Sequence, residues 1–170
     1  LASMLESTIG ITKISSGDLI RAHLTDEYTK SELLKGQMAP DEQKVCDLVT
    51  QEISKYTDCI LDGFPRWFAQ LSTQIHIHAV IYLHVPDEVG ISRLLTRGRY
   101  DDKLEIIDAR IKNYWDKTHP LLEHFKHIGV PVKMIDGNRL QSLVWADAVE
   151  IINDFKKKPQ HTKGQEVKAN

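Results

Sequence analysis

The stretch Cys59-Ile60-Leu61-Asp62-Gly63-Phe64-Pro65-Arg66 joins a short apolar run to a turn that ends on an arginine. Apolar runs of this length, bounded by turn residues, are typical of strands covered on both faces of a parallel sheet. Three other runs have the same strand character: Ile11–Ser15, Ala79–Val85 and Val132–Asp136. The quoted stretch therefore marks the place where one strand of a sheet ends and a loop begins.

Longer amphipathic stretches separate these runs and predict helices. They are Asp41–Tyr56, Asp87–Arg97, Lys103–Lys126 and Leu140–Lys157. Alternation of strands and helices predicts an α/β fold, with a parallel sheet between two layers of helices. Gly36 and Gly98 stand where helices are expected to stop, and Pro120 is expected to kink or break the longest helix.

The composition limits the classes of function. The chain has 170 residues, the length of one domain, and a formal net charge of −2, which excludes a non-specific nucleic-acid binder. It has no apolar run long enough to span a bilayer and no signal peptide at its start, so we expect a cytoplasmic protein with no membrane partner. Cys46 and Cys59 have no metal-binding spacing and are expected to be free thiols.

Ligands of parallel α/β sheets bind at the carboxyl ends of the strands, so the residues directly after each strand are the first candidates for a binding site. After the first strand comes Ser15-Ser16-Gly17-Asp18-Leu19-Ile20-Arg21, and after the second comes Gly63-Phe64-Pro65-Arg66, with Gln70 one turn later. Beyond the third strand, its helix ends in Arg93-Leu94-Leu95-Thr96-Arg97-Gly98-Arg99-Tyr100-Asp101-Asp102, with Arg110 downstream. Several arginines are therefore expected at one edge of the sheet.

Clustered arginines indicate phosphate binding, because planar guanidinium groups match phosphate oxygens two at a time. Asp62, at the tip of an apolar strand, is placed to hold Mg²⁺ through its water shell. Each residue also has an ordinary structural explanation. A strand-end aspartate is more often a turn or cap residue, and helical arginines are usually solvated. Asp101 and Asp102 either orient the arginines or favour the dipole of the next helix.

Taken together, the motifs resemble the signatures of adenylate kinases in their usual order: Ser-Ser-Gly-Asp-Leu-Ile-Arg, Leu-Asp-Gly-Phe-Pro-Arg with a following Gln, and Arg-Gly-Arg-Tyr-Asp-Asp. The resemblance runs from about Ile11 to Asn138. It implies a three-layer P-loop kinase fold with a parallel five-stranded sheet. It also implies one nucleoside monophosphate kinase domain over residues 1–155, with an acceptor nucleotide-binding part at 17–58 and a short lid at 97–103. Residues 156–170 are expected to form a polar tail.

The resemblance implies a role for each matching residue. Arg21 and Arg66 match the pair that binds the acceptor phosphate, and Gln70 matches the side chain that reads the acceptor base. Arg97, Arg99 and Arg110 match the residues that close on the transferred phosphoryl group. The full expected set is AMP-binding Ser16, Arg21, Gly63, Arg66 and Gln70; ATP-binding Arg93, Arg97 and Asn138; and catalytic Asp62, Arg66, Arg97, Arg99 and Arg110, with Mg²⁺ held by Asp62 through water.

Some positions depart from the family pattern. Met38 and Ala39, in the expected base-packing loop from Gly36 to Asp41, replace its usual apolar pair, and Trp67 is unusual beside Pro-Arg, where packing is the simpler explanation.

The family's first strand and glycine-rich Gly-Lys-Gly-Thr loop are not found in the sequence, and Leu1–Thr8 resembles the rest of the helix after that loop. Because that strand is central to the sheet, we expect the native protein to carry it.

The expected activity is reversible phosphoryl transfer, ATP + AMP = 2 ADP, by direct in-line attack in a monomeric enzyme. A UMP/CMP-type monophosphate kinase is one alternative, and Gln70 favours AMP because its amide pairs with the amino group and ring nitrogen of adenine. A generic P-loop kinase for a small metabolite is another. A non-catalytic nucleotide-binding relative without the P-loop is the third.

Overall fold

A computed structural model of the chain describes residues 1–37, 41–72, 75–99 and 101–157. Met38 and Ala39, Tyr100 of the predicted lid and residues 158–170 of the predicted tail lie outside these ranges. The described strands are β1 (Thr12–Ser15), β2 (Cys59–Asp62), β3 (Val80–His84) and β4 (Val132–Asp136). The helices are α1 (Ala2–Ile9), α2 (Ser16–His23), α3 (Glu27–Leu34), α4 (Glu42–Ile53), α5 (Asp87–Arg97), α6 (Leu104–Asn113), α7 (Pro120–His127), α8 (Gln141–Lys157), the 3₁₀ helix η1 (Phe68–Ser72) and the π-helix η2 (Tyr114–Thr118).

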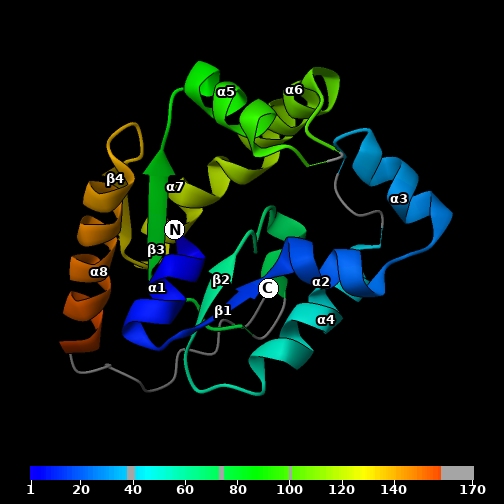
Figure 1. The fold of residues 1–170 in the computed structure, drawn as a ribbon. Helices are drawn as coiled ribbons and strands as arrows, with labels where there is room; N and C mark the ends of the chain where they lie inside the picture. Colours follow the sequence, from blue (N-terminus) through cyan, green and yellow to red (C-terminus); the bar gives the residue numbers. More distant parts are fainter. Residues whose placement is uncertain (38–40, 73–74, 100, 158–170) are drawn as a thin grey trace.

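The four strands form two parallel pairs, which confirms the predicted parallel α/β fold (Figure 1). β1 pairs with β2 in a register that sets Ser15 opposite Asp62, and β3 pairs with β4 with His84 opposite Asp136. Within the described residues, β2 and β3 are not hydrogen-bonded to each other. The expected five-stranded sheet is thus represented by four strands, with a gap in pairing between the two halves.

Two hydrophobic clusters hold this arrangement together. One joins Val49 of α4 to Leu24, directly after α2, and to Phe64, in the loop after β2. The other joins α1, β4 and α8 through Leu5, Ile135 and Ala148, and Ile60 of β2 and Ile81 of β3 pack against it. Because this second cluster touches both strand pairs, α1 and α8 fix one pair relative to the other.

The predicted helix Lys103–Lys126 is three segments, α6, η2 and α7, rather than one. Pro120 lacks an N–H group and takes the first position of α7, directly after the π-helical turn. The predicted break is therefore correct in position. α2 and α3 were not predicted, and both lie in the expected acceptor-binding part.

Glycines end two helices where the sequence predicted a stop. Gly98 adopts a left-handed φ of 74° after α5, and Gly36 adopts φ 72° just after α3. A Cβ atom on Gly36 would lie 2.6 Å from the carbonyl oxygen of Ile106 and 2.8 Å from Cβ of Ala109. The absence of a side chain here lets the backbone at the end of α3 pack directly on α6.

Candidate phosphoryl-transfer site

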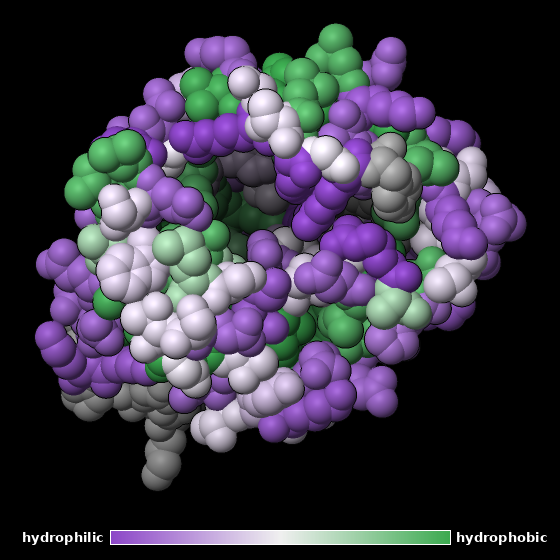
Figure 2. All heavy atoms as spheres, in the orientation of Figure 1, coloured by the Kyte–Doolittle hydropathy of each residue, from purple (hydrophilic) through white to green (hydrophobic). Residues whose placement is uncertain are grey.

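A large cavity of about 2190 Å³ lies between the two strand pairs, with walls from β2, β3 and the loops at their carboxyl ends. Figure 2 shows the hollow, with hydrophilic residues around its rim and hydrophobic residues deeper inside. Nearly all of the predicted site residues line it: Ser16, Arg21, Asp62, Gly63, Arg66, Gln70, Arg97, Arg99 and Arg110. Residues that are scattered in the sequence therefore meet in one place.

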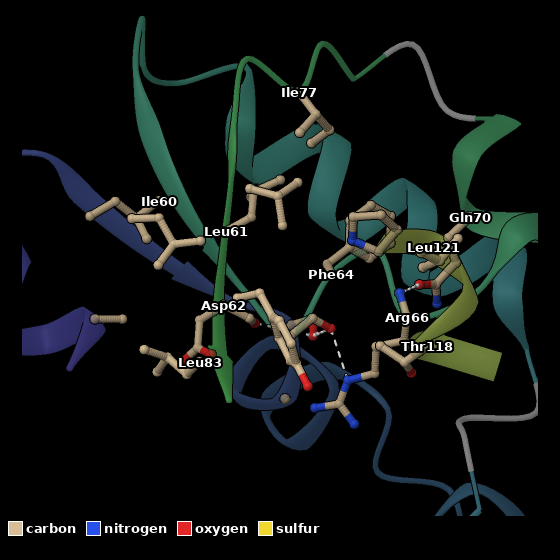
Figure 3. A pocket seen from close by; sticks show the side chains of 18 of the residues that line it. Ile60, Leu61, Asp62, Phe64, Arg66, Gln70, Ile77, Leu83, Thr118 and Leu121 are labelled. Atoms are coloured by element: carbon tan, nitrogen blue, oxygen red, sulfur yellow. Dashed lines mark hydrogen bonds between the residues drawn. The ribbon is translucent and has the colours of Figure 1, made fainter. Parts of the chain in front are cut away.

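The loop after β2 is tied to the start of α2 by a compact set of polar contacts. Ser16 donates a hydrogen bond of 2.6 Å to the carbonyl oxygen of Gly63, and Nε of Arg66 donates to the same oxygen at 3.0 Å (Figure 3). Gly63 has φ 79°, and a Cβ there would lie 2.9 Å from Nη2 of Arg66. The positive φ thus favours glycine, and a side chain here would displace the Arg66 guanidinium.

Arg66 is exposed in the cavity, and within the described part of the chain it has no carboxylate oxygen within 4.0 Å. Enclosure by protein lowers the pKa of its guanidinium below the ordinary value. The charge of Asp62 opposes this shift, and the charges of Arg110 and Arg21 add to it. An arginine remains protonated under such conditions, so the positive potential is retained. Binding of an anion would relieve the repulsion among these three cations.

Arg21 lies on α2 and folds back toward Gly17. Its Nη2 pairs with the carboxylate of Asp18, and its guanidinium nitrogens lie 3.4 Å from the place where a Cβ of Gly17 would be. The ion pair is partly exposed, so it is expected to contribute little stability. It does set the direction of the Arg21 side chain along the cavity wall.

Gln70 of η1 is 5% exposed, and its carboxamide is held at both ends. Its Oε1 accepts a hydrogen bond of 2.7 Å from the backbone N–H of Arg66, drawn in Figure 3. Its Nε2 donates to Oε2 of Glu42 at 2.8 Å. The predicted base-reading residue and the predicted phosphate-binding arginine are therefore directly connected.

The predicted lid is organised by Asp102, whose side chain is 1% exposed. Arg97 donates to both of its carboxylate oxygens, at 2.9 and 2.5 Å, and the backbone N–H of Arg99 donates to it at 3.0 Å. Arg110 pairs with Asp101 and lies 3.7 Å from Asp102. These contacts favour the first of the two explanations of the aspartates, since both orient arginines and α6 begins only at Leu104.

These ion pairs shift the titration of the lid groups. The hydrogen bonds from Arg97 lower the pKa of Asp102 to about 2, with the backbone N–H of Arg99 adding to the effect. The same pairing raises the pKa of Arg97. The ion pair between Arg97 and Asp102 is therefore expected to persist throughout the neutral pH range.

Two predicted ATP-binding residues, Arg93 and Asn138, lie outside the set that lines the cavity. Nη1 of Arg93 donates a hydrogen bond of 2.7 Å to the carbonyl oxygen of Gly137, which joins α5 to the loop after β4. The backbone N–H of Asn138 donates to Asp136 at 2.8 Å. The structure thus brings these two segments together, next to the arginine cluster but not within it.

Asp62 ends β2 at the cavity wall (Figure 3). In the described ranges, no group of three or more His, Cys, Asp or Glu side chains is arranged to hold a metal ion. A single strand-end carboxylate nevertheless suits Mg²⁺, which keeps most of its waters and is completed by substrate phosphates. The donor set fits a metal that arrives with a nucleotide.

Sequence reasoning missed three residues that shape the site. Glu42 and Trp67 hold Gln70 in a hydrogen-bonded network, and Asn113 donates to the carbonyl oxygen of Gly36 at 3.1 Å. Each contact joins segments that are 25 to 77 residues apart. The unusual Trp67 was the one available signal, because an indole N–H next to a binding motif needs a partner.

In the described part of the chain, no helix is both long enough and apolar enough to cross a bilayer. A parallel α/β fold with an arginine-lined cavity at its strand ends is typical of enzymes that bind nucleotide phosphates. Comparison with known proteins gives the family. The family model described as adenylate kinase matches residues 1–130, and the chain belongs to the adenylate kinase family.

Several curated relatives are similar over most of their length. An adenylate kinase of Prochlorococcus marinus is 37% identical over 150 residues, covering 80% of this chain and 81% of the relative. Adenylate kinase 1 of Synechocystis is 36% identical, covering 79% and 80%. An adenylate kinase of Thermus thermophilus is 31% identical, covering 80% of each chain. The family resemblance of the motifs is confirmed.

Proposed function

We propose that this protein transfers a phosphoryl group reversibly between ATP and AMP, giving two molecules of ADP. The observation that carries the proposal is Arg66, whose guanidinium lines the same cavity as Arg21, Arg110 and Gln70 and has no carboxylate oxygen within 4.0 Å in the described part of the chain. The same cavity that would bind the phosphate also contains Gln70, a side chain able to read a base. The similar proteins from Prochlorococcus marinus and Synechocystis are named adenylate kinases, which supports ATP and AMP as the substrates.

The arginines have separate tasks in this proposal. Arg21 and Arg66 bind the phosphate of AMP near the ends of β1 and β2, with Ser16 and Gly63 setting the geometry of the loop. Arg97, Arg99 and Arg110 neutralise the moving phosphoryl group, while Arg93 and Asn138 contact the ATP side. Transfer between the phosphates of two nucleotides demands alignment and positive charge more than covalent chemistry, so no nucleophilic side chain is assigned.

Asp62 would hold Mg²⁺ through water molecules at the end of β2. When bound, the metal would reduce the negative charge of the nucleotide phosphates. Asp62 also faces the positive charge of Arg66. This carboxylate therefore balances the cationic cluster even before a nucleotide enters.

The donor phosphates need a binding loop, and the sequence contains no Gly-Lys-Gly-Thr motif. We assign this task to a glycine-rich loop in a segment that is not in this sequence, preceded by a strand that fits between β2 and β3. Apolar residues Ile60, Leu61, Ile81 and Leu83 line the cavity at this level, as a buried parallel strand requires. Within the described residues, β2 and β3 are not hydrogen-bonded to each other, so a strand between them would be able to pair with both.

The experiment is a coupled assay of ADP formation from ATP with AMP, CMP or UMP, on the native protein after its intact mass has been measured. We expect a mass larger than that of this chain and turnover that depends on AMP. Preference for CMP or UMP would support the other monophosphate kinase alternative. A mass equal to that of this chain with no turnover would support a non-catalytic relative.

We further propose that the enzyme is a cytoplasmic monomer. Light scattering would test the oligomeric state, and cell fractionation would test the location.

A further inference from the structure

A hydrogen-bonded network lies behind the proposed base-binding residue and involves two residues outside the proposed machinery. Glu42 is the first residue of α4, and its Oε2 accepts hydrogen bonds from Nε2 of Gln70 at 2.8 Å and from Nε1 of Trp67 at 2.6 Å. One carboxylate oxygen thus holds an amide and an indole together. Glu42 and Gln70 both line the cavity.

The partners of Gln70 have opposite hydrogen-bonding character, which determines the orientation of its amide. The carboxylate of Glu42 only accepts, so the NH₂ group of Gln70 must face it. The backbone N–H of Arg66 only donates, so the oxygen of Gln70 must face it. Rotation of the amide by 180° would oppose donor to donor and acceptor to acceptor. Only one of the two amide orientations is therefore compatible with the site.

Amide orientation decides which base a glutamine recognises. Adenine presents an amino donor beside a ring-nitrogen acceptor, whereas the corresponding edge of uracil presents a carbonyl acceptor beside an N–H donor. A glutamine that rotates freely would match either base. A glutamine fixed by Glu42 presents one pattern only.

We propose that Glu42 is a positioning residue that fixes the Gln70 amide, and that Trp67 holds Glu42 in place, so that the acceptor site discriminates between bases. The proposal rests on the proposed function, in which Gln70 reads the base. It gives Trp67, whose presence in the binding motif had no explanation other than packing, a specific role as a hydrogen-bond donor.

Surrounding contacts keep the network rigid. Nζ of Lys117, on η2, lies 4.9 Å from the ring centroid of Trp67, so a cation covers the face of the indole. Glu42 lies in the first turn of α4, where the helix dipole favours a negative charge. The backbone N–H of Gln70 donates to the carbonyl oxygen of Trp67 at 3.1 Å, which sets the spacing of the two side chains.

The test is isothermal titration of the protein with AMP and with UMP, for wild type, Glu42→Gln, Trp67→Phe and the control Glu52→Gln. Glu42→Gln replaces a carboxylate, which only accepts, by an amide that can also donate, with little change in shape. Trp67→Phe removes the N–H donor together with part of the indole ring. Glu52→Gln makes the same chemical change on the same helix, at a residue that pairs with Lys55 and does not line the cavity. A merely structural role would change the unfolding temperature without changing the AMP-to-UMP affinity ratio.

We expect Glu42→Gln to lower the affinity ratio by about tenfold and Trp67→Phe by a smaller factor, as suits the loss of one buried hydrogen-bond constraint. Glu52→Gln should leave the ratio unchanged. In a Gln70→Leu background, Glu42→Gln should have no further effect, because the residue it positions is gone. An unchanged ratio in Glu42→Gln, with wild type preferring AMP, overturns the inference. Wild type that does not prefer AMP overturns the proposed function instead.

Discussion

The hydroxyl of Ser16 donates a hydrogen bond of 2.6 Å to the carbonyl oxygen of Gly63, and so joins the start of α2 to the loop after β2. Nε of Arg66 donates to the same carbonyl oxygen. One backbone carbonyl therefore sets the positions of two elements of the proposed phosphate site. Its geometry depends on the positive φ of Gly63 and on the space that its missing side chain leaves.

Gly63→Ala tests this dependence. The new Cβ would lie 2.9 Å from Arg66 and 3.1 Å from Oγ of Ser16, so the guanidinium must move, and we expect AMP affinity to fall by about tenfold or more. Gly10→Ala is the matched control, because Gly10 also has a positive φ, 67°, but has no neighbour within 4 Å of a Cβ. Both variants carry similar backbone strain, of roughly 1–2 kcal/mol. Equal AMP affinity in the two variants would contradict the prediction.

Arg66→Ala tests the phosphate site itself. Removal of the Arg66 guanidinium should lower kcat/KM for AMP by about 10²- to 10³-fold, as expected for a group that neutralises charge on a reacting phosphate. The fold should remain intact, because Arg66 is exposed in the cavity. Steady-state kinetics and circular dichroism measure the two effects.

The control for that experiment is Arg139→Ala. Arg139 pairs with Asp147 and lies 3.9 Å from Asp136, but it is not among the residues that line the cavity. Its loss should leave kcat/KM within about twofold of wild type, as for most surface changes. Near-normal turnover in Arg66→Ala would remove the assigned acceptor site.

Gln70→Leu tests base recognition. It deletes both amide contacts at a buried position, so we expect the ratio of kcat/KM for AMP to that for CMP to fall toward one. The backbone N–H of Arg66 and the carboxylate of Glu42 would each lose a partner, at a cost of about 1–3 kcal/mol to stability for each buried group. Thermal unfolding measures that part separately. An unchanged AMP preference would exclude Gln70 from base reading.

The ion pair of Asp102, in the proposed lid, gives a testable pH dependence. Because the pKa of Asp102 is lowered to about 2, its ion pair contributes stability above the ordinary aspartate pKa of about 4, and this contribution is lost as pH falls toward 2. Carboxyl chemical shifts followed by NMR from pH 7 downward should show Asp102 still ionised at about pH 4, where unperturbed aspartates are half protonated. A midpoint near pH 4 for Asp102 would mean that Arg97 does not hold it in solution.

Local sequence signals were sufficient for the strands and for most of the site. All four strands lie within the predicted runs, because short apolar segments bounded by turn residues have few other structures open to them. The binding motifs directly follow β1 and β2, so their meeting at one edge followed from the parallel topology. Arginine clustering was predictable for the same reason.

Features that depend on tertiary contacts were not predictable. α2 was missed because its first residues, Ser16 to Asp18, have turn character, and only the cap formed by Ser15 with the N–H of Asp18 shows that a helix begins there. The π-helix η2 between α6 and α7 was not predicted either. The Glu42–Trp67–Gln70 network joins residues from α4 and η1, which no local pattern relates.

A crystal structure of the protein with AMP bound tests the central claim most directly, and the distance to measure is from the AMP phosphate oxygens to the guanidinium nitrogens of Arg66. We expect a separation of about 3 Å, with Arg21 on the same phosphate and the adenine edge against Gln70. AMP bound elsewhere, or bound with its phosphate out of hydrogen-bonding range of both arginines, would contradict it.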